Sequence, residues 1–302
     1  MDLKTLTEIN APSGHEQAIR RFLLDELKKL GFAPVLDRMG NVVVVKEGTG
    51  DAPRKRVMVS AHMDEVGLIV TSATEDGYLR IAAAGGIDPR VLVSKRVTVG
   101  EDKLPGVIGA VPIHLQSAAE RKHVLSMDEL LVDIGAKNKD EAERKAPMGT
   151  YISFDTPYVE YGDGFACGKA FDDRVGCLSL LRLLQEELPV DLVACFVSEE
   201  EVGCRGAKGA AFQQEPDIGI VLEGTTCNDL GDVPETAHVC EAGQGVTVSF
   251  MDGASIANRA LFRKALDVAK QENIPHQVKH SVSGGNDGGA IQRAREGVPV
   301  VV

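Results

Sequence analysis

Apolar and polar residues follow two periods along this chain. Short, nearly continuous apolar runs bounded by Gly, Pro or charged residues predict buried strands. Apolar residues that recur every three or four positions predict amphipathic helices. The strands are expected at 41–45, 57–61, 191–196, 218–222, 246–250 and 276–282, and the helices at 17–30, 173–188 and 258–272. Alternating strands and helices are typical of an α/β fold.

The stretch from residue 66 to residue 165 has a different pattern. Short apolar segments alternate there with Gly, Pro and Asp turns, and only one modest helical pattern, at 139–145, interrupts them. This spacing predicts a small, mostly β domain inserted into an α/β chain. We therefore expect a main domain of residues 1–65 and 166–302, with a mixed central sheet flanked by helices, and an inserted β-rich domain of residues 66–165.

Composition narrows the class of protein. The 302 residues are 43% hydrophobic and 26% charged, which is typical of a soluble globular protein. No apolar run approaches the roughly 20 residues that a membrane helix needs, and the N-terminus lacks the pattern of a signal peptide. The formal net charge of -12 argues against nucleic acid and anionic membranes as partners. None of the six cysteines forms a Cys-x-x-Cys pair, so reduced thiols in a cytoplasmic protein are expected.

An acidic run, Glu199-Glu200-Glu201, directly follows the predicted strand 191–196. Open α/β sheets bind ligands at the carboxyl ends of their strands. Three adjacent carboxylates repel one another unless a cation or a proton holds them together. Taken alone, the run fits a solvated turn as well as it fits a site.

Other predicted strand ends and turns carry the same chemistry. His62 and Asp64 follow strand 57–61, Asp172 follows a glycine turn, and Glu223 follows strand 218–222. Together with the acidic run, these groups are able to converge at one edge of a sheet. Oxygen ligands and a single histidine suit two close divalent ions, namely zinc, cobalt or manganese. A spare carboxylate beside them would be a general base.

Two other histidines are weaker candidates for a site. Ser13 and Glu16 predict a capping box before the helix 17–30, so His15 between them is interpreted as structural. His114 is a possible site residue, but we favour its interpretation as an ordinary loop histidine.

Three ordered motifs carry a resemblance to a known family. Ala61-His62-Met63-Asp64-Glu65, Gly168-Lys169-Ala170-Phe171-Asp172-Asp173-Arg174 and Glu200-Glu201-Val202-Gly203-Cys204-Arg205-Gly206-Ala207 resemble the tetrahedral and glutamyl aminopeptidases. The similarity extends along essentially the whole chain. It implies a zinc-peptidase type of fold and the removal of N-terminal residues from short peptides by two metal ions. It also implies that residues 66–165 are a dimerisation domain that helps build large assemblies, often dodecamers.

The resemblance implies a role for each motif residue. His62 would bind one metal, and Asp64 would orient the His62 ring. Asp172 would bridge both ions, and the Asp172-Asp173 peptide bond is often cis in related enzymes. Glu223 would complete the first site, where many relatives have aspartate. Glu201 would bind the second metal, and Glu200 would be the general base for the bridging water. Glu199 is interpreted as structural or solvent-facing.

The chain departs from the family pattern at its end. The second metal's histidine in the family lies shortly after the segment matching Gly297-Val298-Pro299, whereas this sequence stops at Val302. We therefore expect weak occupancy of the second metal site in protein that ends there. The alternatives are a di-metal deacylase or carboxypeptidase, a relative labelled endoglucanase, and a noncatalytic assembly protein. Leucyl-type and glutamyl- or aspartyl-type preferences both remain open.

Overall fold

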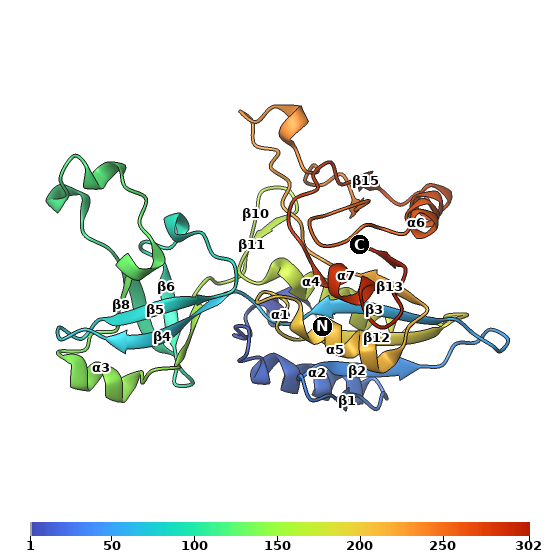
Figure 1. Ribbon diagram of the computed structural model, residues 1–302, viewed down its shortest axis with the longest axis horizontal. Coiled ribbons are helices and arrows are strands. Elements are labelled where there is room, and N and C mark those ends of the chain that lie inside the picture. Colours follow the sequence, from blue (N-terminus) through green and yellow to red (C-terminus); the bar gives the residue numbers. More distant parts are fainter. Residues whose placement is uncertain (1) are drawn as a thin grey trace. The chain divides into compact units, whose positions relative to one another are not determined.

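The computed structural model describes residues 2–302, which form two compact units (Figure 1). The first unit comprises the chain up to Leu6, then Ile19–Met63 and Phe171–Val302. The second comprises Thr7–Ala18 and Asp64–Ala170. No helix among residues 2–302 is long and apolar enough to cross a membrane.

A six-stranded mixed sheet forms the centre of the first unit. β12, β3, β13 and β16 are mutually parallel, whereas β2 runs antiparallel to β12 and β1 pairs antiparallel with β2. The strands lie in the order β1 (Val35–Leu36), β2 (Val42–Lys46), β12 (Asp191–Val197), β3 (Arg56–His62), β13 (Ile218–Val221) and β16 (Val300–Val301). The mixed sheet predicted from the apolar runs is confirmed.

Helices flank this sheet, which is why its strands are apolar at successive positions rather than at alternate ones. On one face, α5 (Arg205–Gln214) packs against β12 and against α7 (Asp287–Gln292), which itself contacts β13 (Figure 1). Small buried residues of α5 bring it close to the sheet: Gly206, Ala207, Ala210 and Ala211. Leu192, Ala194 and Phe196 of β12 point to the opposite face and are equally buried.

The remaining elements of the first unit surround the sheet. α4 (Phe171–Leu183) packs against β3. The helix was predicted over 173–188, but it ends at Leu183 and the chain continues as a turn. α6 (Arg259–Gln271) accompanies a small parallel pair, β14 (Val246–Val248) and β15 (His276–Val278). The other helices here are α1 (Leu3–Thr7), α2 (Gln17–Lys29), which begins at the boundary of the units, and the 3-10 helix η5 (Glu235–Ala237).

The second unit is built on a closed barrel of six antiparallel-paired strands (Figure 1). Around the barrel these are β4 (Gly67–Ala73), β5 (Leu79–Ala84), β8 (Leu131–Asp133), β7 (Leu104–Gly109), β6 (Arg96–Val99) and β9 (Tyr151–Phe154). Leu68, Leu79, Val97 and Ile152 are among the apolar side chains that fill its interior. This mostly β segment within an α/β chain agrees with the fold class predicted from the sequence.

Short elements complete the second unit. α3 (Lys139–Lys145) begins at Asn138, whose side chain accepts a hydrogen bond from the Glu141 N–H and so caps the helix. β10 (Val159–Tyr161) and β11 (Phe165–Cys167) form a hairpin. The 3-10 helices are η1 (Pro89–Val91), η2 (Ile113–Leu115), η3 (Glu120–Lys122) and η4 (Met127–Glu129).

Candidate metal centre

The parallel strands of the first unit bring their carboxyl ends to one edge of the sheet. β12 lies beside β3 with Val197 opposite His62, and β13 lies on the other side of β3 with Val221 opposite Ser60. His62 is the last residue of β3, and Glu223 and Glu200 follow the ends of β13 and β12. The sequence motifs therefore meet where an α/β sheet binds its ligands.

Three of the predicted ligands lie together at this edge. His62 Nε2 is 3.0 Å from Asp172 Oδ1 and 3.9 Å from Glu223 Oε1. One potential ligand atom from each residue lies within 4.8 Å of the other two. The His62 side chain is only 1% exposed, so its ring nitrogen points into a restricted space. A histidine and two carboxylates at this spacing are a donor set that suits a divalent transition-metal ion.

The electrostatics of this group fit a bound cation. Burial raises the pKa of the Glu223 carboxyl well above its usual value; His62 counteracts part of this rise, and Asp172 adds to it. Glu223 Oε2 is buried and has no hydrogen-bond partner within residues 2–302. A buried carboxylate oxygen without a partner is costly unless a proton or a metal satisfies it. The residues present therefore fit a metal ion.

Asp173 and Arg174 hold the backbone that carries His62. Asp173 Oδ2 accepts a hydrogen bond from the His62 N–H at 3.2 Å, and Arg174 Nε donates to the Met63 carbonyl at 3.0 Å. Both side chains are fully buried, and burial raises the pKa of Asp173 well above its usual value. The peptide bond between Asp172 and Asp173 is cis. Asp172 thus faces His62, whereas Asp173 supports it from behind.

Asp64 is fully buried in the second unit, where its Oδ2 accepts a hydrogen bond from the Ser13 hydroxyl at 2.7 Å. The predicted capping box is therefore wrong. α2 begins at Gln17, and the Glu16 carboxylate accepts from the Gly14 N–H at 2.7 Å instead. The Ser13 hydroxyl donates to a carboxylate distant in sequence, and the backbone at Ser13 and Gly14 forms a turn rather than the first turn of the helix.

The acidic run separates into residues with different surroundings. Glu200 is 8% exposed, and its Oε1 accepts a hydrogen bond from the Cys204 thiol at 3.2 Å. Glu199 adopts a left-handed backbone conformation with φ of 55° and pairs with Arg205 at 3.2 Å, which agrees with its structural interpretation. Glu201 is half-buried and belongs to neither group of potential ligands found among residues 2–302.

Glu200 has neighbours whose positions the sequence did not predict. Ligand atoms of Glu200, Cys204 and Asp287 lie within 4.8 Å of one another. Burial raises the pKa of the Cys204 thiol, and Asp287 and Glu200 raise it further. Cys204 therefore stays protonated and acts as a donor to Glu200. The glycine-rich segment around Asn286-Asp287 was the available signal for Asp287.

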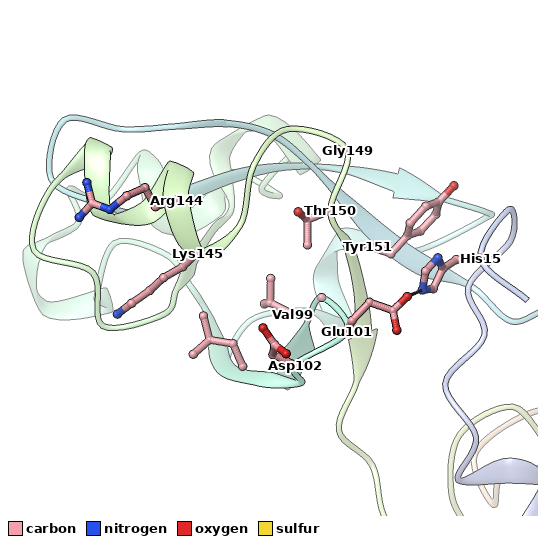
Figure 2. A pocket seen from close by; sticks show the side chains of 11 residues that line it. His15, Val99, Glu101, Asp102, Arg144, Lys145, Gly149, Thr150 and Tyr151 are labelled. Carbon is pink, nitrogen blue, oxygen red and sulfur yellow. Dashed lines mark ion pairs between the residues drawn. The ribbon is translucent and has the colours of Figure 1, made fainter. Parts of the chain in front are cut away.

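The two weaker histidine candidates both belong to the second unit. His15 stacks on Tyr151 with ring centroids 4.8 Å apart, and its Nε2 lies 3.0 Å from Glu101 Oε1. Figure 2 shows both contacts at one side of a cavity of about 610 Å³, with Arg144 on the other side. His15 thus has a structural role, and His114 is exposed in η2.

Comparison with known proteins supports one family. The sequence profile of the M42 glutamyl aminopeptidases matches residues 40–302. The chain is 34% identical to the glutamyl aminopeptidase of Lactococcus lactis over 98% of this chain and 85% of that one. It is 32% identical to the lysyl aminopeptidase of Pyrococcus furiosus over 99% of this chain and 86% of that one.

A solved structure gives the same result. The TET1 peptidase of Pyrococcus horikoshii, described as assembling into a tetrahedron or a large octahedral shell, is similar with a TM-score of 0.84 and 31% identity. The match covers 99% of this chain and 88% of that one.

Proposed function

The chain belongs to the M42 glutamyl aminopeptidases, which are metal-dependent, and from that premise we propose how its residues divide the work of cleaving a peptide bond. The substrates are short peptides that lose their N-terminal residue. The observation that carries the proposal is the group formed by His62, Asp172 and Glu223, in which a buried oxygen of Glu223 has no hydrogen-bond partner among the residues that the structure describes.

His62, Asp172 and Glu223 would hold one divalent ion. Asp172, half-exposed beside His62, and Glu201 are assigned to a second ion, with zinc or cobalt favoured and manganese as a further possibility for both sites. Asp64, two residues beyond His62 in the chain, is assigned to its orientation. When bound, such ions acidify water and polarise the scissile carbonyl.

Glu200 is the general base in this proposal. It follows the end of β12, is almost buried, and receives one hydrogen bond from a neutral thiol. A carboxylate in that position accepts a proton from the attacking water and passes it to the leaving amine. The Cys204 thiol donates to Oε1 and so helps to orient the carboxylate.

Substitution of each glutamate in the acidic run tests this division. Glu200→Gln should lower kcat by roughly 10²- to 10⁴-fold while leaving bound metal unchanged. Glu201→Gln should lower the bound metal measured by elemental analysis. Glu199→Gln is the matched control, because Glu199 pairs with the exposed Arg205 and is assigned neither a metal ion nor the proton transfer. Equal loss of metal in the Glu200 and Glu201 variants would refute the assignment.

Aminoacyl-anilides assayed with defined metals test the activity itself. Turnover should disappear with a chelator and return with zinc or cobalt, and the best N-terminal residue identifies the preference. Relatives with glutamyl and lysyl names show that this preference varies among similar chains. Hydrolysis of a glucan that persists in the chelator, without hydrolysis of any anilide, would favour the endoglucanase alternative instead.

We also assign the chain to the cytoplasm and to a homo-oligomer, with a tetrahedral dodecamer as the specific form. Residues 66–165 are the proposed dimerisation domain. The similar TET1 peptidase, described as a tetrahedron or an octahedral shell, supports the oligomer. Light scattering of the purified chain tests it, and a monomer at micromolar concentration would count against it.

A further inference from the structure

Two thiols lie close together in the segment that follows Glu223. Cys227 Sγ and Cys240 Sγ are 3.5 Å apart. The backbones are also adjacent, because the Cys227 carbonyl accepts hydrogen bonds from the N–H groups of Val239 and Cys240 at 2.8 and 3.3 Å. The two sulfur atoms therefore face each other on neighbouring backbone segments, and a disulfide requires such a close approach.

Hydrogen bonds rather than apolar contacts close the segment on itself. It is the orange loop that projects from the first unit in Figure 1, with the 3-10 helix η5 at its far end. Asn228 Nδ2 donates to the Ala237 carbonyl at 2.9 Å, and Leu230 is 72% exposed. The loop therefore has little apolar packing of its own, and its closure depends on hydrogen bonds near the two cysteines.

We propose that Cys227 and Cys240 form a reversible disulfide when the protein meets a peroxide. The disulfide fixes the loop that begins directly after Glu223. This inference goes beyond the proposed peptidase function and does not depend on it, because it requires only the two thiols and an oxidant.

The exposure of the two thiols gives the order of the steps. Cys227 is half-buried, whereas Cys240 is 4% exposed, so Cys227 meets the peroxide first. The Cys227 thiol loses its proton and attacks one peroxide oxygen, and the O–O bond breaks; the leaving hydroxide takes up that proton, so a sulfenic acid and one water are formed. The Cys240 sulfur then attacks the sulfenic sulfur, the S–O bond breaks, and a second water leaves. Two thiols are oxidised by two electrons and the peroxide is reduced to water.

The other cysteines lack this arrangement. Cys177 and Cys195 are fully buried within the first unit, and Cys167 is exposed in β11 of the second. Cys204 donates to Glu200, a residue of the proposed machinery. Cys167 is therefore the matched control, since a peroxide reaches it but no second thiol lies beside it among the described residues.

Peptide mapping of the purified, pre-reduced protein tests the proposal, with the oxidation carried out at about pH 9–10, where the Cys227 thiolate becomes populated. After hydrogen peroxide, one linked peptide pair should contain Cys227 and Cys240, whereas Cys167 should be oxidised without a link. Dithiothreitol should restore both thiols of the linked pair. Cys167→Ser should form the same link, whereas Cys227→Ser and Cys240→Ser should not. Hydrogen exchange of residues 228–239 should slow in the linked form.

Three results would overturn the proposal. Wild-type protein that keeps both thiols in millimolar peroxide excludes the disulfide, and this result needs no variant to fold. Over-oxidation of Cys227 to a sulfinic acid without a linked pair also excludes it. If the disulfide forms but the hydrogen exchange of residues 228–239 is unchanged, the disulfide does not fix the loop.

Discussion

The ion pair between Lys169 and Glu65 is almost completely buried, so breaking it should cost the second unit much of its stability. Lys169 Nζ lies 2.7 and 2.9 Å from the two carboxylate oxygens, and the side chains are 8% and 3% exposed. The ammonium also donates to the Ile9 carbonyl at 3.3 Å, and Glu65 Oε1 accepts from the Ala11 N–H at 2.8 Å. Three chain segments therefore meet at this pair.

Lys169→Met keeps the length of the side chain but removes its charge. Glu65 would then be a buried carboxylate that retains the hydrogen bond from Ala11, and loss of one partner of a buried pair costs about 3–5 kcal/mol. Adding Glu65→Gln removes the leftover charge while keeping an oxygen for Ala11. The double variant should therefore recover about 2 kcal/mol or more of that loss.

Urea unfolding followed by circular dichroism measures these changes, and hydrogen exchange of residues 9–13 reports them locally. Lys139→Met is the matched control, because Lys139 pairs with Glu75 in the same unit at 3.2 Å but both side chains are exposed. It should leave the urea midpoint unchanged. The reasoning fails if Lys169→Met is as mild as this control, or if the double variant is no more stable than the single one.

Three further predictions concern single side chains. Cys204→Ala removes the thiol donor to Glu200 and should lower kcat by roughly 2- to 10-fold with little change in KM, so unchanged kcat would show that the thiol does not position the base. Ser13→Ala removes a donor to the buried Asp64 carboxylate and should lower the free energy of unfolding by about 1–3 kcal/mol in urea titrations, whereas no loss would contradict this pairing. Burial, and then the contact with its partner thiol, raises the pKa of Cys227 to about 11. Because the thiolate is the nucleophile, alkylation of Cys227 by iodoacetamide should be slow at pH 8 and rise with pH toward that value, and a plateau near pH 8 would contradict the shift.

The sequence was informative about the site wherever a buried strand ended in a polar residue. Runs such as 192–197 are apolar at every position because helices cover both faces of the sheet, so the strands and the type of sheet were predictable from the apolar pattern. Once β3 and β13 were parallel neighbours, His62 and Glu223 had to emerge at the same edge. The convergence of these residues is a consequence of topology, which the apolar pattern encodes.

Contacts made outside regular elements were not predictable in this way. Ser13 matched a local capping pattern, yet its hydroxyl donates a charge-assisted hydrogen bond to the buried carboxylate of Asp64, and the helix begins only at Gln17. Cys227 and Cys240 meet across an irregular loop, for which no periodic signal exists. Local patterns are overridden when a distant buried charge needs the same group.

Adjacent carboxylates show how backbone conformation separates chemically identical groups. Glu200 lies beside Cys204 and Asp287, whereas Glu201 belongs to neither ligand group found among residues 2–302. Between β12 and α5 the chain turns sharply through a left-handed residue, Glu199, and neighbouring side chains on such a turn point in different directions. Glu200 and Glu201 are chemically identical in the sequence. The backbone turn places Glu200 where it accepts a hydrogen bond from the Cys204 thiol. Because Glu200 is almost buried and is oriented by a thiol donor, this difference in surroundings is the physical reason to assign the proton transfer to Glu200.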